Sequence, residues 1–317
     1  MTKKLNIDQV NIILMLLSAV TAFFIPFELF LFVYAFLGPL HYLTEINWLR
    51  QKEYFTTSKS DYKLLLFLIF LIGISVFGPL SKYLRVFLPV IIAFSFFSAF
   101  AMQYYKSQKS KLIFYGISFL ASVGMFLIFQ QKIEILFSIF LPSLIHVFIF
   151  TGLFILVGAL KTNNKTGKLS LFVFLLCGVA LLFISSFPVK NVITETITNS
   201  YRSFERINQT LINYFSDNTN SVFSSKIGIQ IMRFIAFAYT YHYLNWFSKT
   251  SIIQWHKTSK PILISIFLIW IISVILYIYN YNAGLKWLYL LSLAHVFLEF
   301  PLNFLIIRNI VTKVKTA

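Results

Sequence analysis

Residues 261–282 read PILISIFLIWIISVILYIYNYN, a run without a single charged side chain. A helix needs about 20 mostly apolar residues to cross the hydrocarbon core of a bilayer. Lipid offers the peptide backbone no hydrogen-bond partner, so a spanning segment of this kind must satisfy its own backbone groups by forming a helix. The stretch therefore predicts a transmembrane helix.

The composition extends this prediction to the whole chain. Its 317 residues are 58% hydrophobic, include 38 Phe and have a mean hydropathy of +0.80. Soluble globular domains are about 45–50% apolar, so the excess indicates an integral membrane protein. The single cysteine, Cys177, lies in an apolar run, which excludes both a disulfide framework and a cysteine metal site.

Ten segments have the length and hydropathy of a membrane span. They are residues 10–25, 27–49, 64–81, 83–105, 112–131, 133–160, 169–187, 227–248, 261–282 and 285–308. We therefore predict an all-α fold, a polytopic bundle of about ten transmembrane helices. Residues 1–317 are expected to form one integral-membrane domain.

The net charge of +17 comes from Lys and Arg residues that lie mostly in the gaps between these spans, which argues against a nucleic-acid-binding surface. Of the Lys and Arg residues, 18 lie in one set of alternate gaps and eight in the other, and Arg233 lies within a span. Cytoplasmic loops carry the excess of positive charge. The bias predicts cytoplasmic N- and C-termini in a cell (inner) membrane, and heavy use of Lys, Asn, Ile and Phe suggests a bacterial source.

One non-membrane segment is long, the outer loop 188–226. Apolar side chains recur in it at helical spacing. They are Tyr201, Phe204, Ile207, Leu211 and Phe215. We expect either an amphipathic helix on the outer membrane surface or a cap that covers the helix ends.

Four of the five histidines lie within predicted spans, in the second, sixth, eighth and tenth. They are His41, His146, His242 and His295. In the predicted topology these four spans run in the same direction. Ionisable residues inside a membrane are costly and usually functional, so the pattern predicts one shared polar site.

Two of these histidines have a glutamate four residues later, Glu45 in HYLTE and Glu299 in HVFLE. This spacing places each carboxylate on the helix face of its histidine. A metal-bound imidazole usually donates its other N–H to a carboxylate or a carbonyl. Each glutamate is thus expected to orient an imidazole or to be a further ligand, and Tyr239 and Asn245 are expected to support the site beside His242.

The donor set favours a metal ion. Imidazole with carboxylate suits iron, zinc or copper, and open positions beside such ligands are typical of non-haem Fe(II) oxygenases. We expect Fe(II), while zinc, copper and haem remain alternatives. A site walled by hydrocarbon also favours a lipid-soluble substrate that enters from the bilayer.

The order of these motifs resembles the Brp/Blh family of β-carotene-cleaving dioxygenases. GPLHYLTE around His41, SLIHVF around His146, YHYLNWF around His242 and LAHVFLEF around His295 are similar to four motifs of that family. Trp246 stands where the family has a further histidine. The resemblance implies a multispan, iron-dependent enzyme that splits a carotenoid into two retinals.

Other functions are compatible with the same residues. The buried His and Glu side chains suit an ion- or proton-coupled transporter, although no inverted repeat is visible in the sequence. Two histidines could be axial ligands of a b-type haem, and the protein could be a scaffold without chemistry. The sequence assigns neither a catalytic residue nor an oligomeric state.

Overall fold

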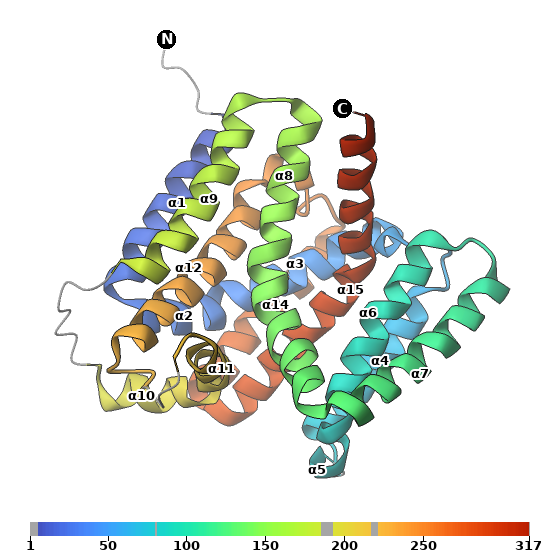
Figure 1. Cartoon of the computed structure of the whole chain (residues 1–317), viewed down its shortest axis with the longest axis horizontal. Coiled ribbons are helices and arrows are strands. Elements are labelled where there is room, and N and C mark those ends of the chain that lie inside the picture. The colour runs from blue at the N-terminus through green and yellow to red at the C-terminus, as the bar shows by residue number, and fades with distance from the viewer. Residues whose placement is uncertain (1–5, 80, 185–192, 217–220, 317) are drawn as a thin grey trace. The chain divides into compact units, whose positions relative to one another are not determined.

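The computed structural model describes residues 6–79, 81–184, 193–216 and 221–316. Every regular element in these ranges is a helix (Figure 1), which confirms the predicted all-α class. The chain divides into two compact units. The first contains Met1–Leu37 and Ser143–Ile252, and the second contains Gly38–Pro142 and Ile253–Ala317.

Seven helices in the described ranges are long and apolar enough to cross a membrane. They are Ile7–Phe24, Pro26–Gln51, Arg85–Tyr104, Gln108–Thr162, Lys165–Phe183, Lys260–Tyr279 and Tyr281–Thr312. Helix α4 (Tyr62–Phe77) is apolar but shorter, and α12 (Lys226–Ser248) is more polar. These helices are compatible with a membrane bundle, while the number of ten spans and the cytoplasmic termini stay predictions.

Large apolar side chains cover the outer surfaces of these helices. In α14 (Lys260–Tyr279), Ile272 is 60% exposed and Ile278 is 77% exposed. Only Ile266 and Ser273 of this helix are buried. Water would make so continuous an apolar surface unstable, whereas the acyl chains of a bilayer suit it. The exposed side chains therefore agree with the membrane class.

The first unit is built around α12. Its elements are α1 (Ile7–Phe24), α2 (Pro26–Phe32), η1 (Val33–Leu37), α8 (Thr151–Thr162), α9 (Lys165–Phe183), α10 (Glu195–Tyr201), η5 (Arg202–Phe204), α11 (Glu205–Phe215), α12 and α13 (Thr250–Ile253). Helices α1, α9 and α12 lie side by side (Figure 1). Arg233 Nε donates to the carbonyl of Phe23 at 2.9 Å, and Tyr241 Oη donates to Asn11 Oδ1 at 3.1 Å. The earlier residue of α12 contacts the end of α1 and the later residue contacts its beginning, so the two helices are antiparallel.

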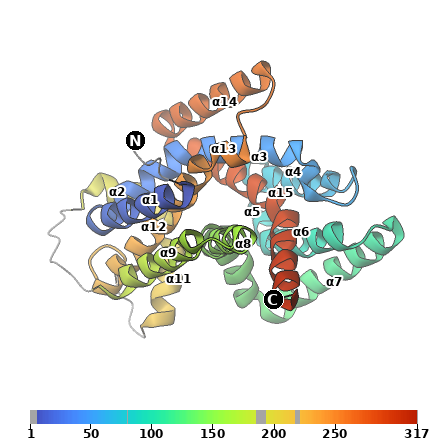
Figure 2. The same ribbon diagram turned by 90° about the horizontal axis from the view of Figure 1, so that it is seen from above.

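The second unit is built around α15. Its elements are α3 (Gly38–Gln51), η2 (Glu53–Phe55), α4, α5 (Ser81–Leu84), η3 (Arg85–Phe87), α6 (Leu88–Tyr104), α7 (Gln108–Ile133), α14 and α15 (Tyr281–Thr316). Helix α15 packs on α3, α4, α6 and α14, and α14 also lies beside α3 (Figure 2). The rings of Phe100 and Phe114 are 5.5 Å apart and those of Phe94 and Phe119 are 5.7 Å apart, so α6 and α7 form an antiparallel hairpin.

One proline lies at a helix break and another lies within a helical run. Helix α1 ends at Phe24 and α2 begins at Pro26, because proline cannot donate a backbone hydrogen bond. The predicted spans 112–131 and 133–160 belong to one helical run, Gln108–Thr162, with non-helical backbone angles at Phe129. Pro142 lies within η4 (Glu134–Phe150), a π-helical segment that joins α7 to α8.

The predicted outer loop, described over residues 193–216 and 221–226, forms a cap on α2. Tyr201 is fully buried, and its ring lies 5.0 Å from that of Phe27 and 5.5 Å from that of Phe30, both in α2. At the far end of the predicted apolar stripe, Phe215 is 64% exposed. The fully buried residues of α11 are Asn208 and Ile212. The 3₁₀ turn η5 shifts the helical phase between α10 and α11.

Candidate metal centre

Helix α3 presents the first predicted pair. His41 Nε2 lies 3.1 Å from Glu45 Oε2, and the two residues are 1% and 4% exposed. The contact confirms the geometry that the i,i+4 spacing predicts. A polar group without a partner would be costly at such a buried position, and each of these two groups supplies a partner to the other.

Helix α15 carries the second pair beside the first. His295 and Glu299 are 1% and 2% exposed. The ring of His295 stacks on that of Tyr42, with centroids 4.3 Å apart, and lies 5.4 Å from the ring of His41. Glu299 interacts electrostatically with Glu45. The two histidines are therefore level with each other, as are the two glutamates, so α3 and α15 run parallel here.

The first unit contains the other two histidines. His146 lies in η4 and His242 in α12, and their ring centroids are 5.0 Å apart. His146 is 1% exposed, whereas His242 is partly buried. The sequence predicts that these side chains approach each other although 96 positions separate them along the chain, and within this unit the structure brings them together.

Thr151 is a contact of His242 that the sequence does not reveal. Its hydroxyl oxygen lies 2.8 Å from His242 Nδ1, and the residue is 2% exposed. A metal-bound imidazole usually donates its other ring N–H to an oxygen acceptor. Donation from Nδ1 to the Thr151 hydroxyl would leave Nε2 as the nitrogen for a metal. The only sequence signal is a threonine five residues after His146.

Ring spacings within each unit fit a common ion. Imidazole nitrogens bind zinc at about 2.0–2.1 Å, so the centroids of two neighbouring imidazoles on one ion lie roughly 4.5–5.5 Å apart. The spacings of 5.4 Å in the second unit and 5.0 Å in the first lie within this range. Each pair thus has a separation that suits two ligands of one ion.

π-Helical winding accompanies one histidine of each pair. Segment η1 ends at Leu37, four residues before His41, and η4 contains both Pro142 and His146. The π-helix is rare and often occurs at functional sites, because each extra residue per turn turns the following side chains to a new direction. The winding therefore sets the direction in which these imidazoles point.

Asn245 and Tyr239, the residues predicted to support the site beside His242, contact neighbouring side chains of the first unit. Asn245 Oδ1 accepts from Tyr241 Oη at 3.4 Å, and Tyr241 also donates to Asn11 on α1. The ring of Tyr239 lies 5.0 Å from that of Phe30. These contacts hold α12 against α1 and α2, so they fix the helix that carries His242.

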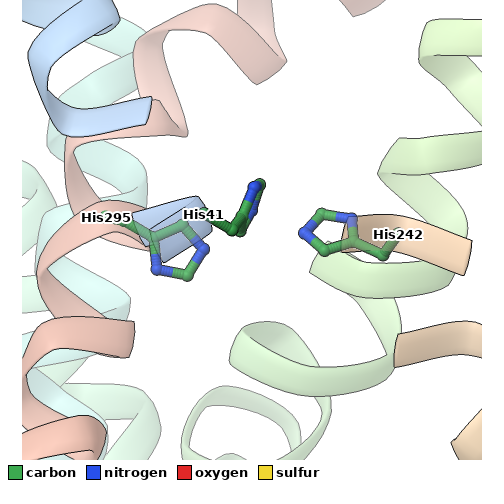
Figure 3. Close-up of side chains that lie close together, drawn as sticks. All are labelled: His41, His242 and His295. Carbon is green, nitrogen blue, oxygen red and sulfur yellow. The ribbon is translucent and has the colours of Figure 1, made fainter. Parts of the chain in front are cut away.

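The two pairs belong to different units. His41 and His295 lie in the second unit and His242 lies in the first, and Figure 3 shows these three side chains. The structure thus brings His41 together with His295 and, separately, His146 together with His242. Binding of one ion by all four histidines stays a prediction.

No family model, curated protein or solved structure matches the chain. The resemblance to the Brp/Blh dioxygenases therefore stays a prediction that depends on the four quoted motifs.

Proposed function

We propose that the chain is an integral-membrane metalloenzyme, a non-haem iron oxygenase that acts on a lipid-soluble substrate such as a carotenoid or another isoprenoid. The proposed ligands are His41, His146, His242 and His295. One observation carries the proposal: each unit holds a pair of imidazoles, three of the four buried and His242 partly buried, at a spacing that suits a shared ion. A buried pair of histidines without such a role would be an expensive feature of a membrane bundle.

The donor set supports a metal. His41 and His295, which are buried, and His242, which is partly buried, are each chemically suited to bind a metal ion. Glu45 lies against the ring of His41 and Thr151 against the ring of His242, which are the partners that orient metal-bound imidazoles. Nitrogen donors beside carboxylates suit Fe(II), and zinc and copper accept the same donors.

The chain's own residues would position the reactants. An iron ion with an open coordination position supplies activation of O2 when it is bound. Glu45 and Thr151 hold two imidazoles in fixed tautomers, and the buried aromatic residues around them keep water out. The apolar outer surface lets a hydrophobic substrate approach from the acyl chains, so the proposed substrate class follows from the surroundings of the site.

Elemental analysis of detergent-purified protein tests the proposal. We expect about one equivalent of iron per chain, lost when any one of the four proposed ligands is replaced by Ala. His256→Ala is the matched control, because His256 is the fifth histidine and is exposed in the inner loop. Metal content that is unchanged in all four variants would overturn the proposal. Co-expression in a β-carotene-producing host then tests the substrate, with loss of colour as the expected result.

A second candidate is an ion- or proton-coupled transporter. It is favoured by the buried His and Glu residues of the predicted spans, such as His41 and Glu45, whose Nε2 and Oε2 atoms lie 3.1 Å apart. Ionisable groups inside a membrane often mark ion or proton pathways. Reconstitution into vesicles with a pH-sensitive dye tests it, since Glu45→Gln should abolish proton movement.

A further inference from the structure

A third polar residue continues the face of α15 that carries His295 and Glu299. Asn303 follows Glu299 by four residues, so the two side chains share one side of the helix. It is 0% exposed, and neither its Nδ2 nor its Oδ1 has a hydrogen-bond partner among the described residues. A buried amide without partners is unfavourable, and such groups in native proteins usually have a ligand or a function.

Two buried carboxylates lie on the same pair of packed helices. Glu45 on α3 and Glu299 on α15 are 4% and 2% exposed, α3 packs on α15, and the two carboxylates interact electrostatically. Carboxylates of like charge at buried positions are stable together only when a cation or a shared proton compensates them. His41 contacts Oε2 of Glu45, so Glu45 has a second oxygen, Oε1, with which to bind another group.

The amide supplies a third oxygen in addition to the two carboxylates. A single proton can bridge only two of these three groups, whereas a cation would accept two carboxylates and one amide oxygen as ligands together. Hard cations such as Mg²⁺ and Mn²⁺ prefer oxygen donors of these kinds. The imidazoles, one turn away, suit softer ions.

We propose that Glu45, Glu299 and Asn303 form a second cation site for an oxygen-preferring divalent ion, one helical turn beyond His41 and His295. All three residues lie in the second unit, so the site does not depend on the proposed iron oxygenase. It would add a second ion next to the imidazole site, and the purified protein would then hold two chemically different metals.

Binding of Mn²⁺ to the full-length protein in detergent tests the site, with free Mn²⁺ measured by electron paramagnetic resonance. Asn303→Leu removes the amide at similar volume, and we expect it to weaken Mn²⁺ binding at least about tenfold. Asn303→Asp adds a carboxylate and should strengthen binding by about the same factor, so the pair remains informative if one variant folds poorly. Ser98→Ala is the matched control, since the Ser98 hydroxyl is equally buried and also lacks a partner.

The outcomes separate this proposal from the first. His242→Ala should remove the imidazole-bound metal and leave Mn²⁺ binding intact, because His242 is not one of the three oxygen donors. Loss of Mn²⁺ binding in Asn303→Leu, together with unchanged iron content in all four histidine variants, would support the second site and overturn the first. Wild-type protein that binds no Mn²⁺, as expected for a shared proton, would overturn the second site, as would equal binding in both Asn303 variants.

Discussion

Replacement of Thr151 by Val tests how the protein orients a metal ligand. Valine keeps the shape of threonine and removes the hydroxyl that lies 2.8 Å from His242 Nδ1. A lost hydrogen bond costs about 0.5–1.5 kcal/mol, and a buried group left without a partner costs about 1–3 kcal/mol. Loss of such a partner typically lowers metal affinity about 10–100-fold, which corresponds to roughly 1.4–2.8 kcal/mol.

Competition with a fluorescent chelator on detergent-purified protein measures this affinity. Thr151→Ser keeps the hydroxyl and should bind metal within about threefold of wild type. Because Thr151 is 2% exposed and packs within the unit, thermal unfolding must be recorded for both variants. A Thr151→Val protein that unfolds like wild type and binds metal with wild-type affinity would refute the assigned role of Thr151.

Three further predictions concern stability, each measured by thermal unfolding in detergent. Asp61→Asn leaves the fully buried ammonium of Lys111 without its charge partner and should cost about 3–5 kcal/mol, whereas Asp61→Leu combined with Lys111→Met should cost much less. Burial lowers the pKa of Lys249 to about 8, and Asp8 opposes this shift. The charged amine therefore destabilises the folded protein fully below pH 8, and this destabilisation disappears as the pH rises toward 10.5. Lys249→Met should raise the midpoint of thermal unfolding at pH 7 and have little effect on it near pH 10. Gly178→Ala places a methyl group 2.7 Å from the ring of Phe148 and should cost about 1–3 kcal/mol, while Gly116→Ala meets no atom within 4 Å and should stabilise by about 0.5–1 kcal/mol.

Local spacing predicts the contacts that arise within one helix. The interval from His41 to Glu45 fixes a shared face, and the structure confirms a 3.1 Å contact between the two side chains. The break before Pro26 follows from the missing N–H of proline in the same direct way. Hydropathy also predicts the helical class, because a spanning backbone can satisfy its polar groups in few other ways.

Contacts between distant segments have no such local signal. Thr151 and His242 are 91 residues apart, and neither the hydroxyl nor its direction can be inferred from a hydropathy pattern. The buried positions of the predicted outer loop also lack a simple local signal. A short 3₁₀ turn at Arg202–Phe204 rotates the following helix, so the buried positions become Asn208 and Ile212. A uniform period of 3.6 residues cannot represent that rotation.

Two helices continue from one compact unit into the other, and both carry a histidine just beyond the crossing. Residues Pro26–Gln51 cross after Leu37, and η4 crosses after Pro142. His41 and His146 each follow the crossing by four residues, and π-helical winding immediately precedes or surrounds each crossing. An α-helix of the same length would turn each ring to another side of its helix, away from its partner. π-Helical winding has poorer hydrogen-bond geometry than an α-helix and is therefore costly. It occurs beside both buried imidazoles, and helix packing alone does not explain this recurrence as simply as a requirement to orient the two rings.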